Sequence, residues 1–587
     1  MKKQQEIHLQ GTPICRGIAI GTLAMFTRAE HPVPEFSLTL DRIDTEIDRF
    51  RQALDKGRNE VRMLQQRLRQ DRIVEGVAIL DSHLQIMDDP LITTNVEEQI
   101  RSLQKNAEHV FESIIRQCKR KFESIEDPFF RERFKDIEEI GRRIFNHLGN
   151  SSRHPTEHIP PNSIVLANDL TVFDTADMDS SRACAFITKH GGVASHAAIV
   201  AKGKGIPYVS SIEMDKVHNA IGTIAIVDGR VGRIIINPTD STLAKYKGIK
   251  EQLHNHFDKL SKKSGLQTET YDGYRVQLRA NIDLLSDLEA LKQFRGHGVG
   301  LLRTEAEFSG GSSLPQEEEQ YIIYRQFVER MDPECVVIRT FDFGGDKFPR
   351  QYQHNESNPF LGFRAIRLML KERELFKMQL KAILRAAVYG NVHLMFPMVS
   401  SVAELIEAKI LLEESKKELK GRGEKYAKDI KVGCMIEVPS AAMTADLLAK
   451  ECDFLSIGTN DLVQYTLAVD RTNSALHHLY TPAHPAILRL IRYVVGASNS
   501  QGIPVSICGE IAADPRFTPV LLGLGVSELS VSTRCLPIIK NAIRNTSIIM
   551  ANRSAEYALS LTSSDEIEQF ITAEYNHTHP EDSLYNV

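Results

Sequence analysis

Residues 190–200 read HGGVASHAAIV and place a histidine where it can react. Gly191 and Gly192 precede Ser195 and His196, and the Ala, Ile and Val residues that follow predict a short helix beginning there. The first turn of a helix behind a glycine hinge is a poor place to bury an imidazole and a good place to use one. Two interpretations are open at this point, a core histidine and a reactive His196.

A second set of polar residues stands where mainly apolar, strand-like segments end in the C-terminal half. Taken singly, each could be a surface ion pair or the cap of the next helix. Six of them at the ends of parallel strands would meet at one rim and favour a functional site. They are Arg303, Arg339, Glu437, Asn460, Asp461 and Cys508, with Glu510 just beyond.

The chemistry of this set suits a small polyanion. Glu437 and Asp461 end consecutive predicted strands and supply hard oxygen ligands, which Mg²⁺ prefers. Arg303, Arg339 and Arg471 supply planar forks for phosphate or carboxylate. A divalent cation beside several arginines therefore predicts a site for a small, multiply charged anion.

Cys508 lies between Ile507 and Gly509, and its type leaves three roles open. A thiol there could fill space, act as a nucleophile or donate a proton. An anionic substrate nearby would favour the neutral thiol over the thiolate.

Eight strand-like runs alternate with helical stretches in this half of the chain, which predicts a (β/α)8 barrel. A doubly wound open sheet is the alternative, although eight regular units favour closure. The runs are RVQLRANI (275–282), GVGLLRTE (298–305), CVVIRTFD (335–342), VHLMFPM (392–398), VGCMIEV (432–438), FLSIGTND (454–461), PVSICGE (504–510) and ELSVSTR (528–534).

The N-terminal half predicts a different organisation. Residues 17–26 form an apolar strand, and helical periodicity follows to about residue 148, in about four main helices. Strand-like segments return from about residue 160. We therefore expect a multidomain α/β protein: an α/β domain of residues 1–34 and 149–235, a helical bundle of 35–148 inserted in it, a linker helix at 236–265, and a barrel over 266–587.

Composition narrows the function classes. The chain has 587 residues, enough for two to four domains, and a formal net charge of −5, which argues against general nucleic-acid binding. Neither a signal peptide nor a run of about 18 apolar residues is present, so we expect no membrane insertion. The eight cysteines lack paired spacing, which favours reduced thiols and a cytoplasmic location.

Several segments closely resemble the phosphoenolpyruvate-utilising enzymes, and among them the enzyme I family of bacterial phosphotransferase systems. The resemblance runs in order over nearly the whole chain, and SIGTNDLVQYTLAVDR alone is highly specific. The segments are GGVASHAAIVA, GVGLLRTE, IRTFDFGGDK, NPFLGFRAIR, MFPMV, IEVPSAA, FLSIGTNDLVQYTLAVDR and CGE.

The resemblance implies a transferase that moves the phosphoryl group of phosphoenolpyruvate to its own His196 and then to the phosphocarrier protein HPr, releasing pyruvate. This is the first step of sugar uptake by the phosphotransferase system. A helix N-terminus would keep the imidazole neutral and stabilise the phosphoryl group once bound. Cys508 matches the residue that protonates the methylene carbon.

The same resemblance distributes the remaining roles in the barrel. Substrate contacts fall on Arg303, Arg339, Asn460, Asp461 and Arg471, Mg²⁺ ligands on Glu437 and Asp461, and Arg364 lies near the phosphate.

The family's architecture implies that the inserted bundle docks HPr, in the region of ILDSHLQIMDDP (79–90). The linker would let His196 move between the barrel and HPr, and the barrel would form a homodimer. Pyruvate phosphate dikinase and phosphoenolpyruvate synthase share the phosphohistidine and barrel domains. Both also need an ATP-binding domain, and we find no phosphate-binding glycine loop in this sequence. A catalytically silent regulatory or scaffold homologue is the remaining alternative.

Three short segments depart from the family pattern. AEFSGG (306–311) follows RTE where the family has Phe-Leu and a further aromatic residue. Cys15-Arg16-Gly17 replaces Ser-Pro-Gly, and Val172-Phe173 replaces Pro-Ser after Thr171. None removes a charged or catalytic residue, so we expect them to affect loops and partner choice.

Overall fold

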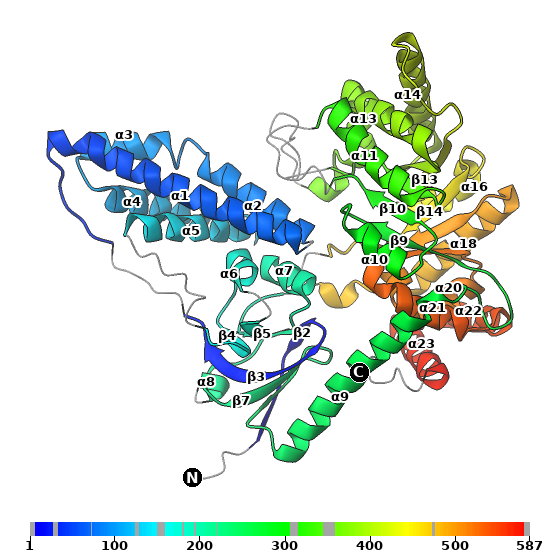
Figure 1. The fold of residues 1–587 in the computed structure, drawn as a ribbon, viewed down its shortest axis with the longest axis horizontal. Helices are drawn as coiled ribbons and strands as arrows, with labels where there is room; N and C mark the ends of the chain where they lie inside the picture. Colours follow the sequence, from blue (N-terminus) through cyan, green and yellow to red (C-terminus); the bar gives the residue numbers. More distant parts are fainter. Residues whose placement is uncertain are drawn as a thin grey trace. The chain divides into compact units, whose positions relative to one another are not determined.

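The structure is a computed structural model, and it divides into two compact units, Met1–Lys250 and Glu251–Val587 (Figure 1). Each unit is described by itself. The described residues are 6–27, 33–71, 73–123, 128–149, 159–178, 181–192, 195–218, 220–305, 315–343, 358–471 and 476–579. The AEFSGG segment lies outside them.

The first unit contains the inserted helical bundle. In the described part of the chain it has five helices, one more than predicted, because a short helix lies between the second and the fourth. The apolar residues at helical spacing in the first of them are all buried: Ile43, Ile47, Phe50, Leu54, Val61, Leu64 and Leu68. The helices are α1 (Ile43–Gln70), α2 (Val74–Met87), α3 (Thr94–Leu103), α4 (Ala107–Glu123) and α5 (Pro128–Leu148).

The α/β part of the first unit is an eight-stranded sheet in the order β1-β8-β7-β3-β4-β5-β6-β2. The early strand β3 pairs in parallel with β4, with Thr22 opposite Ser163, which confirms that it belongs to this sheet. The sequence did not predict the short strands β1, β2 and β8. The bounds are β1 (Ile7–Gln10), β2 (Thr12–Cys15), β3 (Ile18–Met25), β4 (Ser163–Ala167), β5 (Ala183–Thr188), β6 (Tyr208–Ser210), β7 (Ile224–Asp228) and β8 (Arg233–Ile236), with α6 (Val172–Asp177), α7 (His196–Lys204) and α8 (Asp215–His218).

Within this unit, helices α6 and α7 share an apolar core with the bundle. Val172, Phe173 and Ala176 of α6 and Val200 of α7 are buried in the same apolar cluster as the bundle helices. Helix α7 therefore begins beside α2 and α5. The long helix α9 (Asp240–Lys262) then runs across the division between the two units, and the domain boundaries expected above remain predictions.

The second unit contains a closed barrel of eight parallel strands, which confirms the predicted (β/α)8 barrel and excludes the open sheet. Met395, Met435 and Cys508 are among the buried side chains of one interior cluster. The strands are β9 (Gln277–Ile282), β10 (Val299–Arg303), β11 (Val336–Arg339), β12 (Val392–Phe396), β13 (Lys431–Ile436), β14 (Phe454–Gly458), β15 (Val505–Cys508) and β16 (Glu528–Ser532).

Helices follow the strands and carry the outer layer (Figure 1). They are α10 (Asp287–Gln293), α11 (Glu317–Met331), α12 (Ala365–Lys371), α13 (Arg373–Ala386), α14 (Val402–Gly421), α15 (Pro439–Met443), α16 (Ala445–Leu448), α17 (Thr459–Leu467), α18 (Pro485–Gln501), α19 (Glu510–Ala513), α20 (Thr518–Gly523), α21 (Leu536–Arg544), α22 (Ile548–Ser560) and α23 (Ser564–Thr578).

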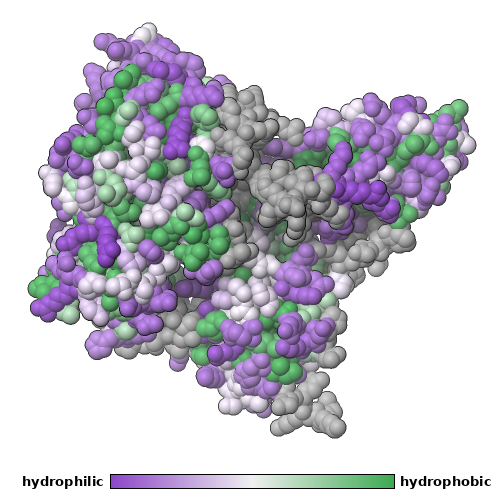
Figure 2. All heavy atoms as spheres, turned by 180° about the vertical axis from the view of Figure 1, so that it is seen from behind, coloured by the Kyte–Doolittle hydropathy of each residue, from purple (hydrophilic) through white to green (hydrophobic). Residues whose placement is uncertain are grey.

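Figure 2 shows hydrophilic and apolar side chains intermixed over the visible face. Among the described residues, none of the helices is both long and apolar enough to span a bilayer.

Candidate functional site

His196 is the first residue of α7, as the sequence predicted, and its side chain is 34% exposed. Ser195 caps the helix, because its Oγ accepts a hydrogen bond from the Ala198 amide at 3.3 Å. Gly191 has φ +135°, and a Cβ there would lie 2.8 Å from the Tyr208 hydroxyl. The sequence therefore needs glycine at this turn, which brings the chain to an accessible helix N-terminus. Such a terminus favours a bound anion.

An acidic residue of the bundle faces the histidine. Asp136 Oδ1 lies 3.7 Å from His196 Nδ1, and the same oxygen lies 3.0 Å from Nε2 of His83. Burial works to raise the pKa of Asp136, but the neighbouring imidazoles of His196 and His83 outweigh it and leave the pKa well below its ordinary value. This carboxylate is therefore charged at neutral pH. The sequence analysis missed both partners, since α5 and α2 reach α7 only in the folded unit.

At the barrel, two buried arginines meet a shared aspartate. Arg339, the last residue of β11, places Nη1 3.2 Å from Asp342 Oδ2 and Nη2 3.3 Å from Glu305 Oε1. Arg364 donates from Nη2 to both Asp342 oxygens, at 2.9 and 3.0 Å, and also lies 3.2 Å from Asp461 Oδ2. The carboxylates outweigh burial and raise the pKa of both arginines, so both stay charged.

Glu437 and Asp461 are the candidate metal ligands, and both are buried. The Met398 amide donates to Glu437 Oε1 at 2.7 Å. Burial, followed by the charges of Asp461 and Asp342, raises the pKa of Glu437 to about 8. A carboxyl group with so raised a pKa is one that a cation would restore to its charged form.

Asp461 Oδ1 is buried and makes no hydrogen bond in the structure. Within the described residues, no group of three or more His, Cys, Asp or Glu side chains is arranged to hold an ion by itself. Mg²⁺ commonly takes only one or two protein carboxylates and completes its shell with substrate oxygens and water. The orphaned oxygen and the Glu437 carboxyl group therefore fit such an ion together with a phosphate ligand.

Cys508 ends β15 and is 3% exposed. Its Sγ lies 3.6 Å from Ser456 Oγ and 3.5 Å from the Ile457 carbonyl oxygen. Burial is the main cause that raises the pKa of this thiol, so it is protonated at neutral pH. Gly509 follows with φ +113°, and a Cβ there would lie 2.3 Å from Thr459 Oγ1. The strand thus ends in a neutral, enclosed thiol that can give a proton.

Arg303 and Arg471 have looser contacts: Arg303 ends β10, and Arg471 follows helix α17. Arg303 Nη1 is 3.4 Å from Asp283 Oδ1, and its side chain is 37% exposed. Arg471 Nη1 is 3.8 Å from Asp461 Oδ1, and its side chain is 39% exposed. The structure thus places two partly exposed cations beside a buried charge cluster.

Asn460 and Glu510 connect two neighbouring strand ends. The Asn460 Oδ1 atom accepts a hydrogen bond from the Glu510 amide at 3.0 Å, and its backbone carbonyl accepts one from Tyr480 OH at 3.1 Å. A Cβ at Gly458 would lie 2.6 Å from Glu437 Oε2. The close approach of these segments explains why glycine stands at the end of β14.

The sequence analysis left out three members of the cluster, namely Glu305, Asp342 and Tyr465. Asp342 stands in the quoted motif IRTFDFGGDK, and Tyr465 in SIGTNDLVQYTLAVDR. Tyr465 OH accepts from Arg364 Nη1 at 3.0 Å. Charge balance was the available signal, because buried arginines need nearby carboxylates.

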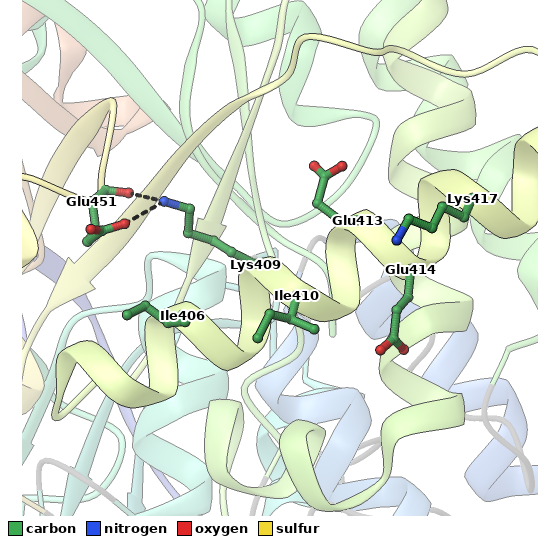
Figure 3. A pocket seen from close by; sticks show the side chains of 7 residues that line it. All are labelled: Ile406, Lys409, Ile410, Glu413, Glu414, Lys417 and Glu451. Atoms are coloured by element: carbon green, nitrogen blue, oxygen red, sulfur yellow. Dashed lines mark hydrogen bonds and ion pairs between the residues drawn. The ribbon is translucent and has the colours of Figure 1, made fainter.

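A shallow surface depression of about 370 Å³ lies along α14 (Figure 3). Six of its seven lining residues come from that helix, and Lys409 reaches the backbone oxygen and Oε2 of Glu451, both at 2.9 Å. None of the strand-end residues lines it. The depression is therefore separate from the candidate site.

Comparison with known proteins agrees with this geometry. Residues 258–548 match the PEP-binding domain of the PEP-utilising enzymes, residues 10–133 their N-terminal domain and residues 159–232 their mobile domain.

Curated relatives match over nearly full length. The phosphoenolpyruvate-protein phosphotransferase of Priestia megaterium is 37% identical over 571 residues, covering 97% of this chain and 99% of the relative. Proteins of the same name from Listeria monocytogenes and Staphylococcus carnosus are 38% and 36% identical over 564 residues, covering 96% of this chain and 98% of each relative. The chain therefore belongs to the PEP-utilising enzymes, in the family of the phosphoenolpyruvate-protein phosphotransferases.

Proposed function

We propose that this protein transfers the phosphoryl group of phosphoenolpyruvate to His196 and then to HPr, and that it releases pyruvate. The observation that carries the proposal is the union, at one end of the barrel, of buried arginines, two carboxylates suited to a cation and the neutral thiol of Cys508. Phosphoryl transfer depends mainly on positioning and on neutralising charge, and this set supplies both.

In the proposed complex, phosphoenolpyruvate lies over the barrel strand ends. The exposed Arg303 and Arg471 guanidinium groups bind and orient its anionic groups, while Arg339 supplies a fixed positive charge below them. Asn460 gives a neutral polar contact. Arg364 holds Asp342 and Asp461 in place, which keeps the carboxylates aimed at the substrate.

The family uses a divalent metal ion, and we assign Mg²⁺ to Glu437 and Asp461. When bound, the ion would neutralise phosphoryl oxygens and the charge that develops on them. The protein's own part is to hold the two carboxylates together in a buried place, where burial and then the charge of Asp461 raise the pKa of Glu437 until a cation binds.

The reaction balances with the groups present. A ring nitrogen of His196 forms the new bond to phosphorus, and the bond from phosphorus to the enol oxygen breaks. The electron pair of that bond becomes the enolate, whose methylene carbon takes the proton of the Cys508 thiol to give pyruvate. Water then reprotonates the thiolate. The phosphoryl group passes from His196 to HPr in a second transfer.

The architecture supports further proposals. We infer that the bundle of residues 35–148 docks HPr, including the segment 79–90, and that the linker at 236–265 lets His196 travel between its two partners. Homodimerisation through the barrel and a cytoplasmic location follow from family membership and belong to the same proposal.

Incubation with Mg²⁺ and phosphoenolpyruvate labelled in its phosphate tests the assignment, with His196→Ala as control. Acid-labile, base-stable label on the wild type alone, which moves to added HPr, is the expected result. An unlabelled wild type that still binds phosphoenolpyruvate would favour the alternative, a catalytically silent homologue.

A further inference from the structure

The bundle contributes a charged group to the histidine site, although the bundle's expected role is only to dock a partner. Asp136 on α5 lies against the His196 ring, with Oδ1 3.7 Å from Nδ1. Its side chain is 13% exposed, so bulk water screens this charge little. A fixed carboxylate near one ring nitrogen decides which nitrogen carries the proton.

His83 on α2 lies against the same carboxylate. Its ring is 1% exposed, and its Nε2 lies 3.0 Å from the same Oδ1 atom. The phenyl ring of Phe173 lies against His83, with ring centroids 5.0 Å apart, and the guanidinium group of Arg143 lies 4.0 Å from the centre of that phenyl ring. His83 is thus enclosed and cannot easily turn away from Asp136.

Phe173 stands in the Val172-Phe173 pair that departs from the family's Pro-Ser after Thr171. Its ring is buried in the apolar core that α6 and α7 share with the bundle. This departure therefore places an aromatic ring against His83.

We propose that His83, Asp136 and His196 form a positioning chain for phosphoryl transfer. During the reaction, Asp136 accepts a hydrogen bond from the Nδ1–H group of His196, so that Nε2 is the unprotonated nitrogen that attacks phosphorus. Nδ1 keeps its proton during the transfer, and the carboxylate faces the positive charge that the phosphorylated ring acquires. The 3.7 Å separation exceeds a hydrogen bond, and such contacts shorten when substrate binds.

The proposal rests on the proposed role of His196, and the test separates the two. The full-length protein, without HPr, receives Mg²⁺ and labelled phosphoenolpyruvate, and the rate of label transfer is followed in a single turnover. Asp136→Asn keeps the side chain's size and removes its charge. We expect the rate to fall about tenfold to a hundredfold, as is typical when the partner that orients a histidine is lost.

Glu139→Gln is the matched control. Glu139 is a buried carboxylate on the same helix, and its Oε2 lies 2.8 Å from Arg142 Nη2. This variant should transfer label at the wild-type rate. Equal losses in Asp136→Asn and Glu139→Gln would mean general damage to α5 and would overturn the proposal.

A second readout does not depend on turnover. In protein with ¹⁵N-labelled histidine, the His196 signals, assigned by their loss in His196→Ala, should show a proton on Nδ1 in the wild type and a shift toward Nε2 in Asp136→Asn. If the proton stays on Nδ1 in the variant as in the wild type, the positioning role is refuted, even if the wild type proves unable to take label.

His83 supplies the last arm. His83→Leu removes the imidazole that lies 3.0 Å from Asp136 and should slow label transfer, whereas His83→Gln keeps a polar group beside the carboxylate and should restore part of the rate. Equal rates in both variants would show that His83 has no part in positioning Asp136.

Discussion

Arg364→Lys tests whether the buried charge cluster acts in the reaction or only in the fold. Arg364 is 7% exposed, and its Nη2 alone contacts both oxygens of Asp342 and one of Asp461. Its Nη1 also donates to Tyr465 OH at 3.0 Å. A lysine ammonium keeps the charge but cannot span these partners, because it lacks the planar fork.

The expected loss follows from the contacts. A hydrogen bond to a charged group contributes about 1.5–3 kcal/mol, so losing the one to Asp461 alone should lower kcat/KM by roughly tenfold to a hundredfold. Breaking a buried charge pair altogether costs about 3–5 kcal/mol, which sets the upper limit for the loss of stability. Pyruvate release at varied Mg²⁺ and thermal unfolding measure the two effects.

Arg516→Lys provides the matched control in the same barrel. Arg516 contacts one aspartate through both oxygens and a second carboxylate, since Nη2 lies 2.6 Å from Asp514 Oδ2 and Nη1 lies 2.8 Å from Glu568 Oε2. It is less buried than Arg364, and it contacts none of the strand-end residues. The variant should lose stability and keep its turnover. If Arg364→Lys likewise keeps wild-type turnover and Mg²⁺ dependence, the cluster serves only the fold.

Three further changes separate the proposed steps. His196→Ala should abolish labelling yet keep the thermal protection that phosphoenolpyruvate gives the barrel; loss of that protection would contradict the division of labour. Cys508→Ala should slow pyruvate formation about 10²–10⁴-fold while substrate binding changes little, and a normal rate would exclude the thiol as proton donor. The pKa of Glu437 is raised to about 8, so the native state binds this proton more tightly than the unfolded chain does. Up to about pH 8, the contribution of this group to the free energy of unfolding therefore falls as the pH rises. Because a cation must displace that proton, apparent Mg²⁺ affinity should rise by up to about tenfold per pH unit until about pH 8; a flat profile, or one kept by Glu437→Gln, refutes the ligand assignment.

The barrel was predictable because most of its strands are short apolar runs, and three of them, β10, β11 and β15, end at Arg303, Arg339 and Cys508. Hydrophobic alternation and order along the chain were enough to place β9 to β16. The strands β1, β2 and β8 were missed, since each has only four residues; β1 is also largely exposed, and half of β2 is exposed. The bundle helix that was not predicted, α3, is only ten residues long, which is too short for its helical periodicity to stand out.

The candidate site was predictable only where chemistry coincides with a strand end. Arg339 and Cys508 each close a strand, and their types drew attention there. Asp342 lies three residues beyond Arg339, and its pairing with Arg364 depends on a contact between separate loops. Asp136 and His196 are 60 positions apart in the sequence and lie on helices of different layers. No local sequence pattern could therefore reveal their contact.

The parallel pairing of β3 with β4 has a consequence for synthesis on the ribosome. β3 ends at Met25, and its neighbour β4 begins at Ser163, so about 140 residues are synthesised before the two strands can pair. This takes on the order of ten seconds at ordinary elongation rates. The helices α1 to α5 emerge during that wait and pair with near neighbours, as in α1 with α2 and α4 with α5. The nascent bundle can therefore fold first and bring the tethered β3 close to the point where β4 emerges, which shortens the search that closes the sheet.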